Sequence, residues 1–166
     1  SALIEYGYLS DAETFTYDVN LHGLKIGVNG DFTVSSSEVV YGNYFMQEKL
    51  LFASGSTTVG TQGKVAVIQL AKALEGENEL EIVVEGHTDS DDLKSSNHPK
   101  NNWELSVLRA TAVVEIMTAN SSINPKILTA AGRSKYNPSG TDKAANRRIE
   151  VILTPNLDKL YDIISK

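Results

Sequence analysis

Residues 86–89 read GHTD, and residues 102–110 read NWELSVLRA. These two segments place a histidine beside Asp89 and an arginine, Arg109, twenty positions further along the chain. Such residue types serve three kinds of chemistry: binding of a metal ion, acid–base catalysis, or recognition of a charged ligand. The rest of the sequence has to decide among the three.

The pattern of candidate metal ligands argues against a metal site. His22, His87 and His98 are far apart, whereas a zinc site on one helix face needs two histidines three to five residues apart. A calcium loop counted from Asp89 would need Gly and Glu at positions 94 and 100, and both hold Lys. We therefore expect no metal and no other cofactor, and we interpret the acidic cluster of Asp89, Asp91 and Asp92 as a solvated loop.

Catalytic motifs are also missing from the sequence. The chain contains no GxSxG elbow, and the segment GSTTVGTQGK lacks the spacing of a phosphate-binding loop. A pair of catalytic carboxylates stays open, because Asp and Glu are plentiful, but no motif selects one. We predict no catalytic residues and expect that the protein is not an enzyme.

A clamp for a charged ligand is the third possibility. Asp89 follows a predicted strand, where loop residues often meet ligands, and Arg109 lies near the border of the buried face of a predicted helix. A carboxylate and a guanidinium together suit a zwitterion, whose ammonium and carboxylate groups they would bind. The residues alone leave two simpler readings open: Asp89 and Arg109 pair with each other, or Arg109 is an ordinary surface residue.

Composition restricts the partners. The chain has 166 residues, 41% hydrophobic and 22% charged, and a formal net charge of −6. These values are typical of a globular domain and argue against nucleic acid as the partner. The chain contains no run of 18 apolar residues, the length that a membrane-spanning helix requires, and it has no cysteine. Because the sequence begins SALIEYG, we expect a mature or trimmed fragment, with any anchor upstream. The oligomeric state is not predicted.

The first part of the chain has strand-like alternation. Residues 15–21 alternate apolar and polar side chains, residues 24–28 repeat the pattern, and Asn29-Gly30 is a favoured hairpin turn. Residues 35–38 are predicted to be a loop. We therefore predict an antiparallel β-rich extension over residues 1–43, followed by a second domain over residues 44–166.

The second part alternates strands with helices. Predicted strands cover 44–52, 80–86, 127–132 and 147–153, and a Gly/Ser/Thr-rich loop covers 53–63. One helical face is formed by Val67, Leu70, Ala71 and Leu74. Asn101 is a predicted N-cap, with Glu104 three residues on, for a helix whose buried stripe is Leu105, Leu108, Ala112, Val113 and Ile116. A short closing helix is predicted from Leu157, Leu160, Tyr161 and Ile164. This order predicts a two-layer α/β sandwich.

Four ordered motifs resemble a known family. VEGHTD, NNWELSVLRATAVVEIM, INPKILTAAGRSKYNP and ANRRIEVIL are similar to the successive motifs of the OmpA-like peptidoglycan-binding domain. The forms NWELSVLRA and LLFASGS are most similar to the branch that includes the flagellar stator protein MotB. The resemblance covers residues 44–153 and implies a βαβαββ core with a mixed sheet.

The resemblance also implies a function and its residues. The domain would bind the peptidoglycan stem peptide non-covalently, at the free end of meso-diaminopimelate, and would anchor an envelope protein to the cell wall. Asp89 and Arg109 would hold the two charges of that zwitterion. Asn102 would bond the peptide backbone, and Arg147 would lie at the mouth of the last strand. His87 would shape the turn as a structural histidine.

The resemblance further implies a location, the periplasm of a Gram-negative bacterium near the outer membrane. Three departures from the family pattern concern ligand contacts: Ala53 where Asp is common, Lys143 in a shortened segment before Asn146, and extra acid at Asp91 and Asp92. The alternative function is therefore an envelope module of the same fold that serves structure or protein–protein contact without binding the cell wall.

Overall fold

The computed structural model describes residues 7–9, 17–21, 24–26, 32–34 and 42–156, together with residues 158, 162, 164 and 165. The strands of the main sheet are β1 (Gly7–Leu9), β5 (Gly42–Gln47), β6 (Leu80–His87), β7 (Leu128–Gly132) and β8 (Arg148–Pro155). The helices are α1 (Glu48–Leu51), α2 (Thr61–Ala73), α3 (Asn102–Asn120), the 3₁₀ turn η1 (Pro125–Ile127) and α4 (Lys143–Asn146).

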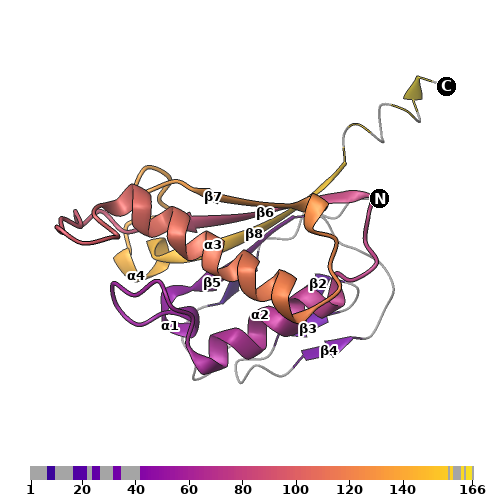
Figure 1. The fold of residues 1–166 in the computed structure, drawn as a ribbon, viewed down its shortest axis with the longest axis horizontal. Coiled ribbons are helices and arrows are strands. Elements are labelled where there is room, and N and C mark those ends of the chain that lie inside the picture. Colours follow the sequence, from indigo (N-terminus) through magenta and orange to yellow (C-terminus); the bar gives the residue numbers. More distant parts are fainter. Residues whose placement is uncertain are drawn as a thin grey trace.

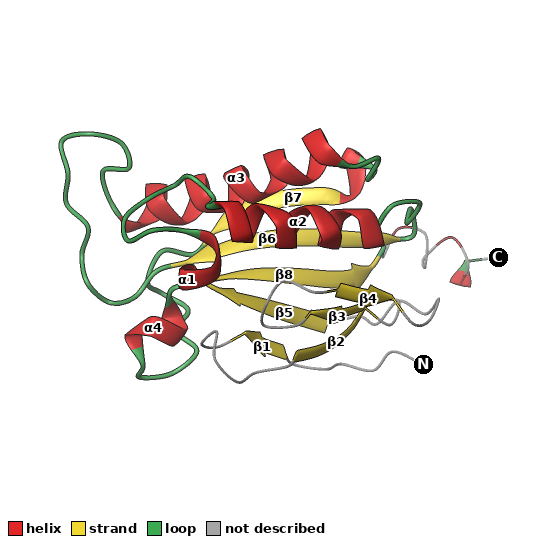
Figure 2. Ribbon diagram, turned by 90° about the horizontal axis from the view of Figure 1, so that it is seen from below, coloured by secondary structure: helices red, strands yellow, loops and turns green. Residues whose placement is uncertain are grey.

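The main sheet is mixed and carries its helices on one face. Its strand order is β1-β5-β8-β6-β7. Strand β8 runs antiparallel to both β5 and β6, whereas β6 and β7 are parallel. Helices α2 and α3 lie beside each other over one face of the sheet (Figures 1 and 2). The predicted two-layer sandwich with a βαβαββ core is confirmed.

A second, three-stranded sheet precedes this core. Strands β2 (Tyr17–Leu21), β3 (Leu24–Ile26) and β4 (Phe32–Val34) pair antiparallel in that order, as the alternation predicted. Strand β1 behaves differently, because it joins the main sheet parallel to β5. The turn predicted at residues 29–30 and the loop predicted at 35–38 lie outside the described residues.

The core fills the space between the sheet and its helices. Every second residue of β6 and β8 points into it, which is the period of a strand with one face on a core. The predicted face of α2 is confirmed, since all four of its residues are at most 2% exposed. The core residues on these elements include Val67, Leu70, Ala71, Leu74, Leu80, Ile82, Val84, Ile149, Val151 and Leu153.

The predicted buried stripe of α3 is wrong in part. Leu108 is 38% exposed, and Ala112 and Ile116 are only partly buried against the core. The face that meets the sheet also contains three polar residues that hydrophobic periodicity does not select, Asn102, Ser106 and Arg109. The apolar residues buried beside them are Leu105, Ala110, Val113 and Met117. Each of the three polar side chains has hydrogen-bond partners, which makes its burial tolerable.

Close approach of backbones explains why Ser106 faces inward. A Cβ on Gly86 would lie 2.0 Å from the Ser106 carbonyl oxygen, and one on Gly132 would lie 2.5 Å from Ser106 Oγ. The two glycines therefore let α3 rest directly on β6 and β7. Ser106 Oγ donates to Trp103 O at 2.9 Å and accepts from Ser134 N at 3.1 Å. This contact sets the rotation of α3 and thereby the position of Arg109.

The end of the first core strand differs from the prediction, and most of the predicted closing helix lies outside the described residues. The strand predicted over residues 44–52 ends at Gln47, and helix α1 follows, in which Phe52 N donates to Glu48 O at 2.7 Å. In the predicted closing helix, Leu157, Leu160 and Tyr161 lie outside the described residues, and Ile164 is 74% exposed. Within the described part, no helix has the length and apolar character that a membrane crossing requires.

Candidate functional site

Asp89 lies just beyond β6, as predicted, at one end of the sheet. Its Oδ2 accepts a hydrogen bond from Arg147 Nη1 at 2.7 Å, and its Oδ1 accepts from Asp91 N at 2.9 Å. The Arg147 side chain is one third exposed, and its hydrogen bond to Asp89 raises the pKa of the guanidinium. The structure thus brings two of the four predicted site residues into direct contact.

Arg109 is buried rather than at the border of the helix face. The residue is 3% exposed, and its Nη1 lies 2.6 Å from Glu48 Oε2. Its Nε donates to Ser56 O at 2.8 Å, and the guanidinium carbon lies 4.8 Å from the centre of the Phe52 ring. Neither simpler reading of Arg109 holds, since it is not a surface residue and its carboxylate partner is Glu48 rather than Asp89.

Glu48 belongs to the site, although no sequence motif selects it. Its two carboxylate oxygens face different arginines, with Oε2 on Arg109 and Oε1 lying 3.4 Å from Arg147 Nε. Asp89, Arg147, Glu48 and Arg109 therefore form one row of alternating charge from the end of β6 to α3. The sequence gives only a weak signal for Glu48, namely an acidic residue inside the strand predicted over residues 44–52.

Asn102 holds a loop in place. Its Nδ2 donates to Asp91 O at 2.9 Å and its Oδ1 accepts from Leu93 N at 3.2 Å, while the residue is 6% exposed. The neighbouring Asn101 caps α3 as predicted, accepting from Glu104 N at 2.9 Å. Asn102 is therefore a support of the loop over residues 90–101, which flanks Asp89.

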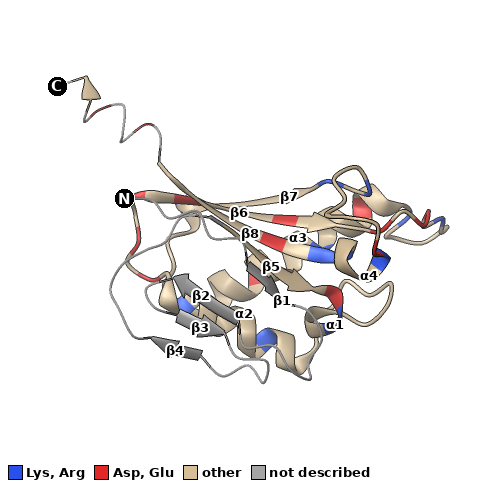
Figure 3. Cartoon of the chain, turned by 180° about the vertical axis from the view of Figure 1, so that it is seen from behind, with Lys and Arg blue, Asp and Glu red and all other residues tan. Residues whose placement is uncertain are grey.

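The acidic residues of that loop are paired with lysines. Asp91 Oδ1 lies 2.7 Å from Lys143 Nζ, and Asp92 Oδ1 lies 2.6 Å from Lys135 Nζ. These hydrogen bonds raise the pKa of both lysines and lower the pKa of Asp92. Figure 3 shows acidic and basic segments together near α4 and the adjoining end of the sheet. Lys143, a departure from the family pattern, thus has a defined partner.

An open groove adjoins Asn102. Its volume is ≈ 410 Å³, and it runs between the 90–101 loop and the turn after β7. Trp103 and Tyr136 stand on its wall with ring centres 5.5 Å apart, and they are 50% and 64% exposed. Exposed aromatic rings beside polar groups are typical of a binding surface. The lining residues are Asp92, Leu93, Lys94, Ser95, Lys100, Asn101, Asn102, Trp103, Ser134, Lys135 and Tyr136.

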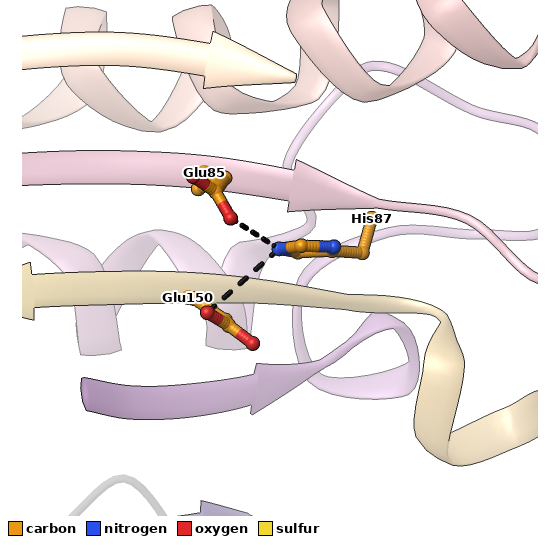
Figure 4. Close-up of side chains that lie close together, drawn as sticks. All are labelled: Glu85, His87 and Glu150. Carbon is orange, nitrogen blue, oxygen red and sulfur yellow. Dashed lines mark ion pairs between the residues drawn. The ribbon is translucent and has the colours of Figure 1, made fainter. Parts of the chain in front are cut away.

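A second charged cluster lies on the sheet face away from the helices. Glu85 of β6 is directly opposite Glu150 of β8, and His87 Nε2 points between their carboxylates (Figure 4). The residue His87 is 2% exposed. Burial, with Arg148 and Arg133 nearby, lowers the pKa of His87 to about 3, and burial, followed by Glu150, raises the pKa of Glu85. The imidazole is therefore neutral at physiological pH.

Comparison with known proteins identifies the family. Residues 51–151 match the OmpA family, and this range is more than half of the 166-residue chain. The chain belongs to the OmpA family. Both the Asp89 loop and Arg109 lie within the matched OmpA range, as do Glu85, His87 and Glu150. Strand β1 and the three-stranded sheet precede it.

The chain is similar to a motility protein and to a cell wall anchor, among others. Motility protein B of Bacillus subtilis (strain 168) is 29% identical over 115 residues, which are 66% of this chain but only 44% of that protein. The cell wall anchor of the type VI secretion system from Pseudomonas aeruginosa is 29% identical, with a TM-score of 0.59 over 68% of this chain and 80% of that one. The periplasmic domain of Helicobacter pylori MotB has the same fold, with a TM-score of 0.65 at 18% identity over 95% of each chain.

Proposed function

We propose that this domain binds peptidoglycan non-covalently and anchors an envelope protein to the cell wall, without cleaving its ligand. Membership of the OmpA family supports the proposal, as does the 29% identity to a protein described as a cell wall anchor. The observation that carries it furthest is the row of alternating charge formed by Asp89, Arg147, Glu48 and Arg109.

We infer that the ligand is the zwitterionic end of meso-diaminopimelate in the stem peptide. Its ammonium group would bind Asp89, which accepts hydrogen bonds only, and its carboxylate would bind an arginine. Arg147 is the more accessible arginine, since its side chain is 33% exposed against 4% for Arg109. The ligand carboxylate would therefore meet Arg147 first and reach Arg109 by taking the place of Glu48.

Asn102 would contribute in two ways under this proposal. Its side chain already fixes the loop beside Asp89, through Asp91 O and Leu93 N. The peptide backbone of the ligand would lie along the adjoining groove, within reach of the Asn102 amide. The Asp91–Lys143 and Asp92–Lys135 pairs leave little unpaired acid on this loop to repel an anionic peptide.

Co-sedimentation with purified sacculi that contain diaminopimelate tests the proposal. The protein should leave the supernatant in a saturable manner, and no soluble sugar or peptide fragment should appear. Lys64→Ala is a control for the loss of a surface charge outside the site. Lys64 is exposed on α2 and lies outside the charged row, so this variant should bind sacculi like the wild type. If the protein stayed in the supernatant, the proposed wall binding would be wrong. If soluble fragments appeared, the proposal that the domain does not cleave its ligand would be wrong.

One observation favours the alternative of a structural module that does not bind the wall. Arg109 is already satisfied by Glu48, Ser56 O and the Phe52 ring, as expected of a residue with a purely structural role. The two functions differ in their response to soluble muropeptide, since only the binding domain would give a saturable heat signal in a titration.

We further propose a location in the cell envelope, on the periplasmic side and near the outer membrane of a Gram-negative bacterium. The description of the H. pylori MotB relative as a periplasmic domain supports the compartment. Fractionation of cells with an antibody against this chain tests it. Recovery in the cytosolic fraction would contradict the proposal.

A further inference from the structure

The cluster of Glu85, His87 and Glu150 has no role in the proposed function. It lies on the sheet face away from the helices, whereas the charged row lies at the sheet end. Its two glutamates are directly opposite each other in the β6–β8 register. Like charges in this position normally destabilise an antiparallel pair, so a group that binds between them would relieve the repulsion.

The histidine completes a set of three converging acceptors. Neither ring nitrogen of His87 makes a hydrogen bond to a described residue, although Nε2 lies 2.8 Å from Glu85 Oε1, because the two groups are not aligned for one. Nε2 also lies 3.8 Å from Glu150 Oε2, and the three ligand atoms are all within 4.8 Å of one another. A buried imidazole that has no hydrogen-bond partner and points between two carboxylates would be stabilised by a cation bound at that point.

Arg148 leaves one oxygen of Glu150 available. Its Nε and Nη2 lie 2.9 and 2.8 Å from Glu150 Oε1, and the same guanidinium also donates to Asn146 O and Asn137 O. Glu150 Oε2, which faces His87, takes no part in that pair. Arg148 thus orients Glu150 as an outer hydrogen-bond partner orients a metal ligand.

We propose that Glu85, His87 and Glu150 form a binding site for a divalent transition-metal ion such as Zn²⁺. One imidazole nitrogen and two carboxylate oxygens suit this class of ion better than Ca²⁺ or Mg²⁺, which prefer oxygen ligands alone. Bonds of about 2.0–2.2 Å place neighbouring ligands of a tetrahedral ion about 3.4 Å apart. The present separations of the three ligand atoms, from 2.8 Å to at most 4.8 Å, bracket that value.

The charges around the cluster are compatible with a dication. The two glutamates contribute two negative charges, and Arg148 on Glu150 and Arg133 near Glu85 are the cations that face them. Both His87 ring nitrogens lack a hydrogen-bond partner among the described residues, so a ring nitrogen can bind a metal ion. The bound ion would tie β6 to β8 and stabilise the sheet.

Titration of the chelator-treated full chain with ZnCl₂ tests the proposal, with melting temperature and calorimetry as readouts. At a hundredfold excess over Kd, the wild-type melting temperature should rise by about 5–10 °C. Glu85→Gln keeps the shape of the side chain but removes a ligand charge, and should weaken the Zn²⁺ affinity by at least about a hundredfold. His98→Gln is the control, because His98 forms an exposed histidine–carboxylate pair with Glu104 outside the cluster.

Cobalt supplies a readout that needs no variant. Co²⁺ bound by the wild-type chain in a four- or five-coordinate site should give visible d–d absorption that Zn²⁺ abolishes. The site is rejected if the wild type shows neither the thermal shift nor the absorption. It is also rejected if Glu85→Gln responds to Zn²⁺ like the wild type, or if His98→Gln removes the response.

Discussion

Glu48 and the buried Arg109 form a largely buried ion pair across 61 positions of sequence, with Glu48 Oε2 2.6 Å from Arg109 Nη1. The pair links the start of α1 to α3, and the Arg109 guanidinium lies over the Phe52 ring. It also keeps a carboxylate in the place where the proposed ligand would put its own. The same contact is therefore both a structural tie and a barrier that the ligand has to displace.

Removing the charge of Glu48 should destabilise the fold. Glu48→Gln leaves the buried guanidinium of Arg109 without an anion, and losing one partner of a buried ion pair costs about 3–5 kcal/mol. Urea unfolding followed by circular dichroism measures the change. Asp91→Asn is the matched control, because it breaks the exposed pair with Lys143 and should change the stability little. Equal effects of the two substitutions would contradict this account.

A side chain on Gly86 should push α3 away from the sheet. The Cβ of Gly86→Ala would lie 2.0 Å from the backbone oxygen of Ser106, which cannot rotate away. We expect a loss of at least about 1–3 kcal/mol of unfolding free energy. Gly140→Ala is the control, since its Cβ would meet nothing within 4 Å. A Gly86→Ala protein as stable as the Gly140→Ala one would show that the contact is looser than described.

Local periodicity predicted the main strands and the two long helices in their order, but it predicted neither the short elements β1, α1, η1 and α4 nor the pairing of charges. The α2 face and the Asn101 cap depend on neighbours three or four positions away, and both were predicted correctly. Arg109 depends on Glu48 and Ser56, 61 and 53 positions away, so the sequence placed it at a helix border. The same holds for Arg147, whose partner Asp89 is 58 positions away.

The rotation of α3 was missed for a related reason. The sequence offers apolar residues on more than one side of this helix, and periodicity alone favoured a stripe through Leu108. The observed face is chosen by Gly86 and Gly132, which admit only a helix side with a small residue, Ser106, at the contact. Polar residues enter a buried face when their partners are present, and those partners come from distant strands and loops.

The first forty residues should contribute stability rather than binding. Strand β1 covers the edge of β5, and an uncovered edge strand invites aggregation. A chain that begins near Tyr41 should therefore melt at a lower temperature than the full chain and aggregate more readily, while it binds muropeptide with similar affinity. Differential scanning calorimetry and a muropeptide titration measure the two properties. Loss of binding by a shortened chain that is still folded would assign the extension to the site.

Acid should weaken the contribution of His87 to stability. Its pKa is lowered to about 3 in the folded chain, chiefly by burial and then by Arg148 and Arg133, against 6.5 in the unfolded chain. The unfolded chain therefore takes up the proton first, and the contribution is complete above pH 6.5 and lost progressively toward pH 3. The contribution of Glu85 to stability depends on pH in the opposite direction. Because its pKa is raised in the folded chain, Glu85 favours the folded state at low pH, and this contribution is lost as pH rises through the folded-state pKa.

The comparison of two variants isolates the histidine effect. In the presence of a chelator, the difference in unfolding free energy between wild type and His87→Gln should shrink as pH falls from 6.5 to 4. The same difference for His98→Gln controls for the loss of any histidine, since the His98 side chain is 68% exposed. A His87→Gln difference that stays constant with pH would show that the imidazole does not titrate in this way.

The sharpest prediction concerns the two ends of the proposed ligand. Asp89→Asn keeps the shape of the side chain but loses the charge for the ammonium group, and Arg109→Lys keeps the charge but loses the planar fork for the carboxylate. A charge-assisted hydrogen bond contributes about 1.5–3 kcal/mol, so each substitution should weaken muropeptide binding by about ten- to a hundredfold. Isothermal titration measures the affinities, and melting curves check that each variant is folded.

A change of ligand separates the two roles. Muropeptides with lysine in place of diaminopimelate lack the side-chain carboxylate but keep the ammonium group. Binding of these ligands should depend much less on Arg109, while its dependence on Asp89 should persist. This crossed pattern follows only if the two residues hold opposite charges of one group, because a general loss of structure would weaken both ligands alike. Folded variants with unchanged affinity for the diaminopimelate ligand would leave Asp89 and Arg109 with purely structural roles, through Arg147 and Glu48 respectively.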